Sequence, residues 1–188
     1  GDFDSDGDPD YVLGNLGTNY KYKTSYEEPF QVYLNDFDEN GSLDIVLGYY
    51  EAGTLYPLRG KQCSSEQMPF ISEKFPTYDL FAQSDLSTIY GESSLDSSLH
   101  YKATEFRSLY IENREKKGFS IQPLPNEAQF SAINSMLIYD ANEDGHLDLL
   151  TAGNLFSSEV ETPRNDAGVG LILLGDGKGN FTPSPPFD

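Results

Sequence analysis

The chain has 188 residues, and its 31 acidic and 12 basic side chains give it a formal net charge of −19 at pH 7. This charge excludes nucleic acid and anionic membrane surfaces as partners, because both attract Lys and Arg. The 12 Phe and 13 Tyr residues exclude a disordered acidic tail, and no apolar run is long enough for a membrane span. The single cysteine, Cys63, excludes an intrachain disulfide and a cysteine-based zinc site. We therefore expect an acidic globular protein whose many carboxylates have a common purpose.

Three segments along the chain share one acidic pattern, D-x-[DN]-x-[DN]-G-x-x-D, followed by a short apolar run. They are GDFDSDGDPDYVLG at the start, NDFDENGSLDIVLG around residue 40 and YDANEDGHLDLLTAG around residue 144. One such segment is well explained as a solvated turn rich in Asp, Asn and Gly. Three matching copies in one chain are poorly explained in that way, so the pattern predicts a shared chemical role.

The spacing is typical of a loop that binds a hard cation through oxygen. Side-chain oxygens at positions 1, 3 and 5 turn toward one centre, the glycine at position 6 allows a sharp turn, and the carbonyl at position 7 adds a ligand. Six to eight oxygen ligands favour Ca²⁺, and we expect about three Ca²⁺ sites. The predicted metal ligands, at positions 1, 3, 5, 7 and 9, are Asp2, Asp4, Asp6, Asp8 and Asp10; Asp36, Asp38, Asn40, Ser42 and Asp44; and Asp140, Asn142, Asp144, His146 and Asp148.

An EF-hand is the first alternative for these loops, because it also begins D-x-D-x-D-G. It requires a glutamate at position 12, where this chain has Leu13, Leu47 and Thr151. The flanking segments YVLG, DIVLGYY and DLLTAG are short, apolar and end at or near glycine, which predicts strands and not helices.

A second repeated feature predicts the architecture. The segments SLYIENREKKGFSIQPLP and GLILLGDGKGNFTPSPP both predict a strand, a polar turn and a second strand, and Leu109 precedes Leu171 by 62 residues. In the last unit we expect strands at 133–139, 149–153, 168–174 and 181–183, with the acidic loop at 140–148. A four-stranded antiparallel unit that recurs at this period is typical of a β-propeller blade. We therefore predict an all-β fold over residues 1–188, a partial propeller with blade parts 1–35, 36–60 plus 104–130, and 131–188.

Residues 61–103 form an expected helical insertion within the second blade. Met68, Ile71 and Phe75 are spaced by three and four residues, Asp85 is placed as a helix cap and Gly91 as a helix stop. The insertion is either a structural cap over the sheet or a site that binds a ligand or partner.

The three acidic segments, with LLGDGKGNFTP closing the last unit, resemble FG-GAP or VCBS repeats. The resemblance covers residues 1–60 and about 105–188. It implies a calcium-binding β-propeller, similar to that of integrin α-chains and of bacterial secreted proteins, with Ca²⁺ loops between the first and second strands of each blade. Integrin-like propellers have seven blades, so we expect further blades from the rest of a longer chain or from another subunit.

The expected function is a non-catalytic calcium-binding module of a secreted or cell-surface protein, outside the cell or in the periplasm, that adheres to a protein or glycan ligand. Loops of this kind suit the millimolar calcium found outside cells. The alternative is the propeller portion of a carbohydrate-active enzyme, a polysaccharide lyase or hydrolase. The sequence contains no G-x-S-x-G, H-E-x-x-H or P-loop motif, and His100 lies in the insertion, where we expect an ordinary packed or surface histidine.

Overall fold

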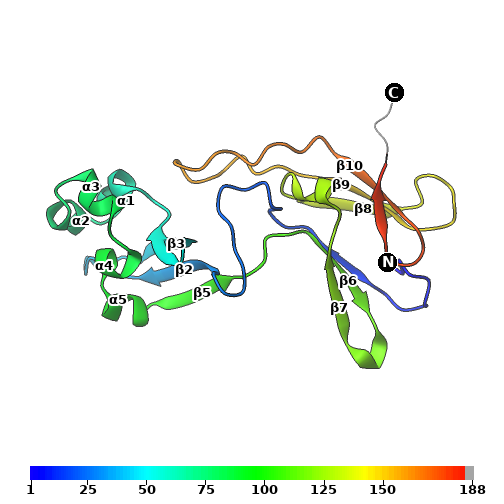
Figure 1. The fold of residues 1–188 in the computed structure, drawn as a ribbon, viewed down its shortest axis with the longest axis horizontal. Helices are drawn as coiled ribbons and strands as arrows, with labels where there is room; N and C mark the ends of the chain where they lie inside the picture. Colours follow the sequence, from blue (N-terminus) through cyan, green and yellow to red (C-terminus); the bar gives the residue numbers. More distant parts are fainter. Residues whose placement is uncertain (185–188) are drawn as a thin grey trace. The chain divides into compact units, whose positions relative to one another are not determined.

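The structure is a computed structural model, and it describes residues 1–184. These residues are mostly β: eleven strands form antiparallel sheets, accompanied by five short α-helices (Figure 1). The mostly-β class predicted from the sequence is therefore confirmed. The chain divides into two compact units. Unit 1 comprises Gly1–Lys21, Phe106–Ser158 and Thr162–Asp188, and unit 2 comprises Tyr22–Glu105 and Glu159–Glu161.

Unit 1 contains two antiparallel sheets. Sheet A has the strand order β1-β6-β7 and sheet C has the order β11-β10-β9-β8. Their elements are β1 (Tyr11–Leu13), β6 (Leu109–Asn113), η1 (Glu115–Lys117), β7 (Phe119–Pro123), η2 (Asn126–Gln129), β8 (Ser135–Tyr139), β9 (Asp148–Ala152), β10 (Leu171–Gly175) and β11 (Phe181–Pro183). Sheet C confirms the four strands predicted for the last unit; residues 185–188 of that predicted blade part lie outside the described residues.

The pairing of the β6–β7 hairpin corrects the predicted second blade. We expected residues 104–130 to continue the sheet that contains residues 36–60, but β6 pairs with β1, with Val12 opposite Tyr110. Sheet C repeats this arrangement, because β10 pairs with β9, with Leu150 opposite Ile172. The hairpin thus belongs to the same sheet as the strand after the first acidic loop. Residues 14–108 lie between the paired strands β1 and β6, and we call this segment the excursion. Sequence spacing could not reveal this, because the step of 62 residues between the two hairpins is the same in either arrangement.

Sheets A and C pack against each other through an apolar core. Tyr110 of sheet A and Phe181 of sheet C contact edge to face, with ring centroids 5.5 Å apart, and Phe3 joins both rings. Leu149 and Leu173 of sheet C are fully buried in the same cluster. Aromatic pairs of this geometry add to the free energy gained from burial alone.

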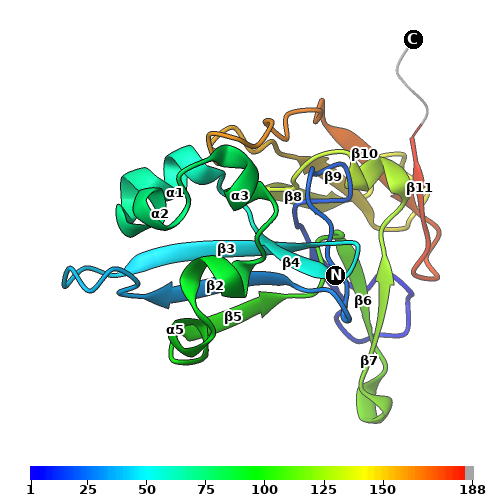
Figure 2. The same cartoon turned by 60° about the vertical axis from the view of Figure 1, so that its left-hand side comes forward.

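Unit 2 contains one four-stranded sheet with helices on one face. Sheet B has the order β4-β3-β2-β5. The elements of unit 2 are β2 (Phe30–Asn35), β3 (Asp44–Glu51), β4 (Thr54–Pro57), α1 (Lys61–Gln67), α2 (Phe70–Lys74), α3 (Tyr78–Ala82), α4 (Leu86–Tyr90), α5 (Glu92–Asp96) and β5 (Leu99–Ala103). Figure 2 shows α1, α2 and α3 lying along one side of β2 and β3. No helix among residues 1–184 is both long and apolar enough to cross a membrane.

The helical insertion is confirmed over most of its length and corrected at its end. Met68, Ile71 and Ile89 are buried against Tyr33 and Val46 of sheet B, which places the helices over the sheet. Residues 99–103, predicted within the insertion, instead form β5, which pairs with β2. The apolar residues of LHYKA alternate with polar ones, a period of two that favours a strand over the helical spacing inferred from Leu95 and Leu99.

The cap of α4 gives a test of the insertion. The Asp85 carboxylate accepts hydrogen bonds from the Thr88 N–H at 2.7 Å and from the Ser87 hydroxyl at 3.0 Å, and contacts with Thr88 hold the pKa of Asp85 below its ordinary value. We expect Asp85→Ala to lower the free energy of unfolding at pH 7 by about 1 kcal/mol. A carboxyl group with a lowered pKa stabilises the fold above its unfolded pKa and loses that contribution as pH falls through the folded value. Urea unfolding should therefore show a smaller difference from the parent chain at pH 3 than at pH 7, and an unchanged difference would contradict the capping role.

Candidate metal sites in three loops

The three acidic segments adopt one backbone conformation. We call them loop 1 (residues 2–10), loop 2 (36–44) and loop 3 (140–148), and number their positions from 1 to 9. Each has two residues in the left-handed region, at positions 4 and 6. The φ angles are 62°, 59° and 62° for Ser5, Glu39 and Glu143, and 97°, 87° and 90° for Gly7, Gly41 and Gly145. Because left-handed residues other than glycine are uncommon, the recurrence of this turn indicates a specific loop structure.

The loops also share a set of internal hydrogen bonds. The glycine N–H at position 6 donates to the carboxylate at position 1, at 3.2, 2.8 and 2.9 Å in loops 1, 2 and 3. The N–H of position 5 donates to the side-chain oxygen of position 3, at 3.2, 3.3 and 3.0 Å. The N–H of position 7 donates to the side-chain oxygen of position 5, at 3.0, 2.8 and 2.9 Å. These bonds turn the side chains at positions 1, 3 and 5 into the loop.

The oxygen atoms in loops 1 and 2 are spaced as a cation requires. One oxygen each from the carboxylates at positions 1, 3 and 9 lies within 4.8 Å of the others, in Asp2, Asp4 and Asp10 and again in Asp36, Asp38 and Asp44. Two oxygens on opposite sides of a Ca²⁺ ion lie about 5 Å apart, so the donors fit a calcium ion. Asp6 is not part of this group. In loop 3 the three carboxylates form no group this tight, and position 3 is Asn142, whose amide oxygen is also a Ca²⁺ ligand type.

The aspartate at position 9 of each loop is buried and accepts several hydrogen bonds. Asp10, Asp44 and Asp148 are 2%, 5% and 1% exposed, and each accepts a hydrogen bond from the N–H of position 2. In loops 1 and 3 the second oxygen accepts from a backbone N–H of the neighbouring strand in the sheet, that of Asn113 in β6 or Gly175 in β10, at 2.8 Å in both. The side chain at position 9 thus stabilises the fold and retains lone pairs for a cation.

Four of the residues that donate hydrogen bonds to these aspartates were not anticipated from the sequence: Gln67, Tyr110, Asn113 and Gly175. Gln67 of α1 donates to Asp44, in the place taken by a strand N–H in the other two loops. The Tyr110 hydroxyl donates to Asp10 at 2.7 Å, and burial together with this contact raises the pKa of Tyr110. The 62-residue step between Asn113 and Gly175 is the sequence signal that could have identified these equivalent donors.

Position 7 differs among the loops, with Asp8, Ser42 and His146, and only its carbonyl was predicted to bind metal. Both carboxylate oxygens of Asp8 are out of contact with solvent and have no hydrogen-bond partner among the described residues. Burial and the nearby Asp6 carboxylate raise the pKa of Asp8. In loop 3 the pKa of Asp144, at position 5, is lowered, because the His146 N–H and the Asn142 side chain donate hydrogen bonds to its carboxylate. Loop 1, with five aspartates, is therefore the loop in which negative charge most needs a counter-ion.

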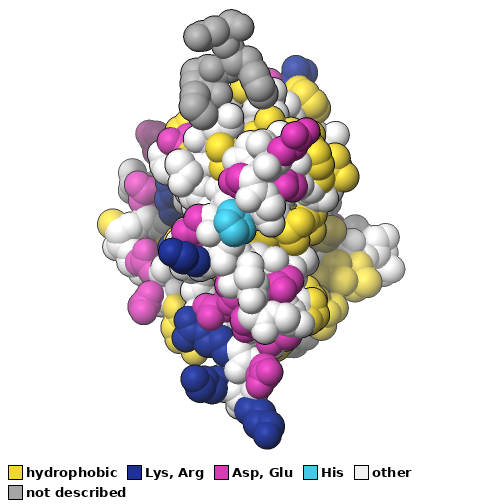
Figure 3. All heavy atoms as spheres, turned by 90° about the vertical axis from the view of Figure 1, so that its right-hand side faces the viewer, with side chains coloured by type: hydrophobic (Ala, Val, Ile, Leu, Met, Phe, Trp, Pro, Cys, Tyr) yellow, Lys and Arg dark blue, Asp and Glu magenta, His cyan; other side chains and the backbone are white. Residues whose placement is uncertain are grey.

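The surface around loop 1 carries charges of both signs. In Figure 3 acidic side chains are spread over the face of the molecule that holds β11, whereas Lys and Arg gather at the end where the β6–β7 tip lies. This tip contains Arg114, Lys116 and Lys117, and Arg114 forms an ion pair with Glu112 at 2.7 Å. A hollow lined by Arg114, Lys117 and Asp6 separates the tip from the loop.

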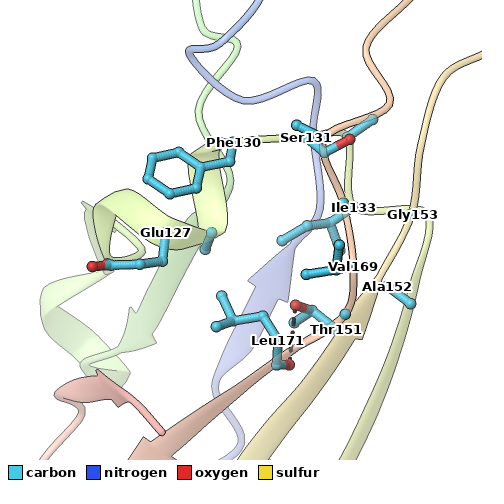
Figure 4. A pocket seen from close by; sticks show the side chains of 14 residues that line it. Glu127, Phe130, Ser131, Ile133, Thr151, Ala152, Gly153, Val169 and Leu171 are labelled. Atoms are coloured by element: carbon cyan, nitrogen blue, oxygen red, sulfur yellow. Dashed lines mark hydrogen bonds between the residues drawn. The ribbon is translucent and has the colours of Figure 1, made fainter. Parts of the chain in front are cut away.

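Each unit also has a pocket distinct from the loops. The pocket in unit 1, of about 200 Å³, is shown in Figure 4; of the residues that line it, Glu127 is the one charged group. The pocket in unit 2, of about 330 Å³, is lined by Asp85, Glu92, Asp96 and His100, among others. His100 stacks on Tyr33 with ring centroids 4.2 Å apart, and burial lowers its pKa.

Comparisons with models of protein families, with curated proteins and with solved structures found no match to this chain. The likeness to FG-GAP repeats therefore depends on the motifs of the sequence itself.

A glycine substitution with a matched control tests the importance of the loop conformation. Gly41 in loop 2 and Gly118 at the β6–β7 tip have φ of 87° and 81°, and no atom lies within 4 Å of a Cβ added at either position. Either alanine substitution should lower the free energy of unfolding through backbone strain, by about 1–3 kcal/mol. Only Gly41→Ala should also weaken calcium binding, measured by isothermal titration calorimetry. Equal effects of the two variants on calcium binding would contradict a role for loop 2.

Proposed function

We propose that the three loops bind Ca²⁺ and that the chain is part of a calcium-stabilised β-propeller. In this proposal it belongs to a secreted or cell-surface protein that binds a protein or glycan ligand without catalysing a reaction. Further propeller blades would come from a longer chain or from another subunit.

The observation that carries the proposal is the shared conformation of the three loops. Their sequences differ at positions 2, 4, 7 and 8, and exchange Asp for Asn at positions 3 and 5, yet the left-handed residues and the hydrogen bonds recur. A common ligand for the shared oxygens at positions 1, 3, 5 and 9 accounts for the retention of these residue types in all three loops. Oxygen is the sole donor type at positions 1, 3, 5 and 9, which suits Ca²⁺ and does not suit zinc or copper.

Calcium would act in the fold as a local counter-charge. The loops bring carboxylates together in a chain whose net charge is already −19, and this repulsion opposes the folded turn. In sheets B and C the loop joins two neighbouring strands, β2 to β3 and β8 to β9. A bound ion would fix the geometry of that connection. Extracellular calcium modules of this ligand type bind at about 10⁻⁴–10⁻³ M, which supports a location where calcium is millimolar.

One observation favours the alternative, a portion of a carbohydrate-active enzyme. The pocket in unit 2 brings Glu92 and Asp96 near the aromatic ring of Tyr33, and carboxylates and aromatic rings are common in sites that act on sugars. If glycan cleavage occurs and is abolished in a Glu92→Gln/Asp96→Asn double variant with unchanged calcium binding, the alternative is supported over the binding module.

Removal of calcium should lower stability. At a free Ca²⁺ concentration about 100 times the dissociation constant, each site adds about 2.7 kcal/mol, so chelation should lower the melting temperature by several degrees. Asp38→Ala, at a half-buried ligand position that takes no part in the sheet, should remove part of this response. Asp166→Ala, an exposed acidic position outside the loops, is the matched control and should leave it unchanged. A melting curve that chelator does not move, in a sample shown to be metal-free, would refute calcium as a structural ion.

Loop 1 should release calcium at a higher pH than loop 3. The pKa values of Asp4 and Asp8 are raised, first by burial, whereas that of Asp144 is lowered, so protons compete with calcium earlier in loop 1 as pH falls. Nuclear magnetic resonance of the Gly7 and Gly145 amides, titrated from pH 7 to pH 4 at fixed calcium, reports the two loops separately, with Gly118 as a reference outside them. Loss of the calcium-bound signal in the reverse order would contradict the assigned electrostatics.

A further inference from the structure

Sheets A and C use opposite faces where they pack on each other. We define the position-10 face of a sheet as the one that carries the first residue after the loop aspartate, and the position-11 face as the other. Sheet A contributes its position-11 face, with Val12 and Tyr110, which are opposite each other in the ladder. Sheet C contributes its position-10 face, with Leu149 and Leu173, which are likewise paired. The contact therefore joins two unlike faces, and we call such a contact head to tail.

The same packing leaves the other face of each sheet open, so the two ends of this two-sheet stack present different faces. The open position-10 face of sheet A carries Tyr11, Leu13, Leu109, Ile111, Phe119 and Ile121. The open position-11 face of sheet C carries Leu137, Tyr139, Leu150, Ile172 and Leu174.

Both open faces are apolar and exposed. Ile121 and Phe119 are 63% and 61% exposed, and Leu137 and Leu150 are 56% and 40% exposed. No charged side chain lies among the strand residues of the face on sheet A. On sheet C the one charged strand residue is Asp148, which is buried in its loop. Contiguous apolar patches of this kind mark sites of association, because scattered single residues and not whole sheet faces are normally left in water.

We propose that unit 1 binds a second copy of this chain head to tail, with the open position-10 face of sheet A against the open position-11 face of sheet C. The basis is continuity with the interface between sheets A and C, which already joins these two kinds of face with its own apolar core. The proposal goes beyond calcium binding and stands whether or not the loops hold a metal.

A head-to-tail contact has a distinctive consequence for assembly. Because the two surfaces are different, a dimer retains one unused face of each kind, so association continues to a closed ring or to a filament. A symmetric contact of one face with itself would stop at a dimer. The charge of −19 opposes association, so the measurement belongs at about 0.5 M NaCl, where the charges are largely screened.

Two single substitutions separate the two faces. Ile121→Asp disables the face on sheet A and Leu137→Asp disables the face on sheet C. Both side chains are exposed, so each variant should fold, which circular dichroism verifies. By sedimentation velocity with 1 mM Ca²⁺, the full chain should assemble beyond a dimer as its concentration rises, and each variant alone should be monomeric or at least tenfold weaker in association.

The decisive measurement is the mixture of the two variants. Each keeps the face that the other lacks, so an equimolar mixture should form a one-to-one dimer and nothing larger. Tyr101→Asp, on the exposed face of sheet B, is the control and should assemble as the parent chain does. A parent chain that stays monomeric at millimolar concentration, or a mixture that remains monomeric, would overturn the proposal. So would loss of assembly in Tyr101→Asp, or a parent chain that stops at a dimer.

Discussion

The buried aspartate at the end of each loop is the interaction on which the rest of the molecule depends. A carboxylate removed from water costs several kcal/mol unless hydrogen bonds replace its hydration. Here the donors come from two directions, the start of the loop and the strand or helix beyond it, as Phe3 and Asn113 show for Asp10. The conformation of the loop and the pairing of the strands are therefore both needed to supply the hydrogen bonds of this one carboxylate. A sheet in the wrong register would leave that charge buried without its donors, which selects the observed register.

The apolar faces of the three sheets are covered in two different ways. Each is apolar on both faces, so one layer of cover is not enough to exclude water. On the face that carries Val12 in sheet A, the cover is sheet C; on the face that carries the equivalent Val46 in sheet B, the cover is a set of short helices. A sheet used as cover, unlike these helices, presents a second apolar sheet face of its own.

Local features of this fold were predictable from the sequence, and long-range pairing was not. The three loops, the strands that follow them and the cap at Asp85 each depend on a few neighbouring residues, and the chemistry of Asp, Asn and Gly specifies them. The partner of β1 depends on residues about a hundred positions away, and the first and second acidic segments, which are similar in sequence, were both candidates for the hairpin formed by β6 and β7. β5 was missed because Leu95 and Leu99 fit a helical spacing as well as the boundary between a helix and a strand. For the candidate sites, the ligand positions followed from spacing, while the donors from Gln67 and Tyr110 required the fold.

The long excursion between β1 and β6 has a consequence for the order in which the chain folds. The ends of this excursion are close together, since the Gly17 N–H donates to the Phe106 carbonyl at 2.7 Å. During synthesis, however, β1 emerges about a hundred residues before its partner, and closing so long a loop is slow compared with forming local contacts. Sheet B and its helices lie wholly within the excursion and are complete before β6 is made. The strand after the first acidic loop thus remains unpaired while the middle of the protein folds, and sheet A forms only after sheet B.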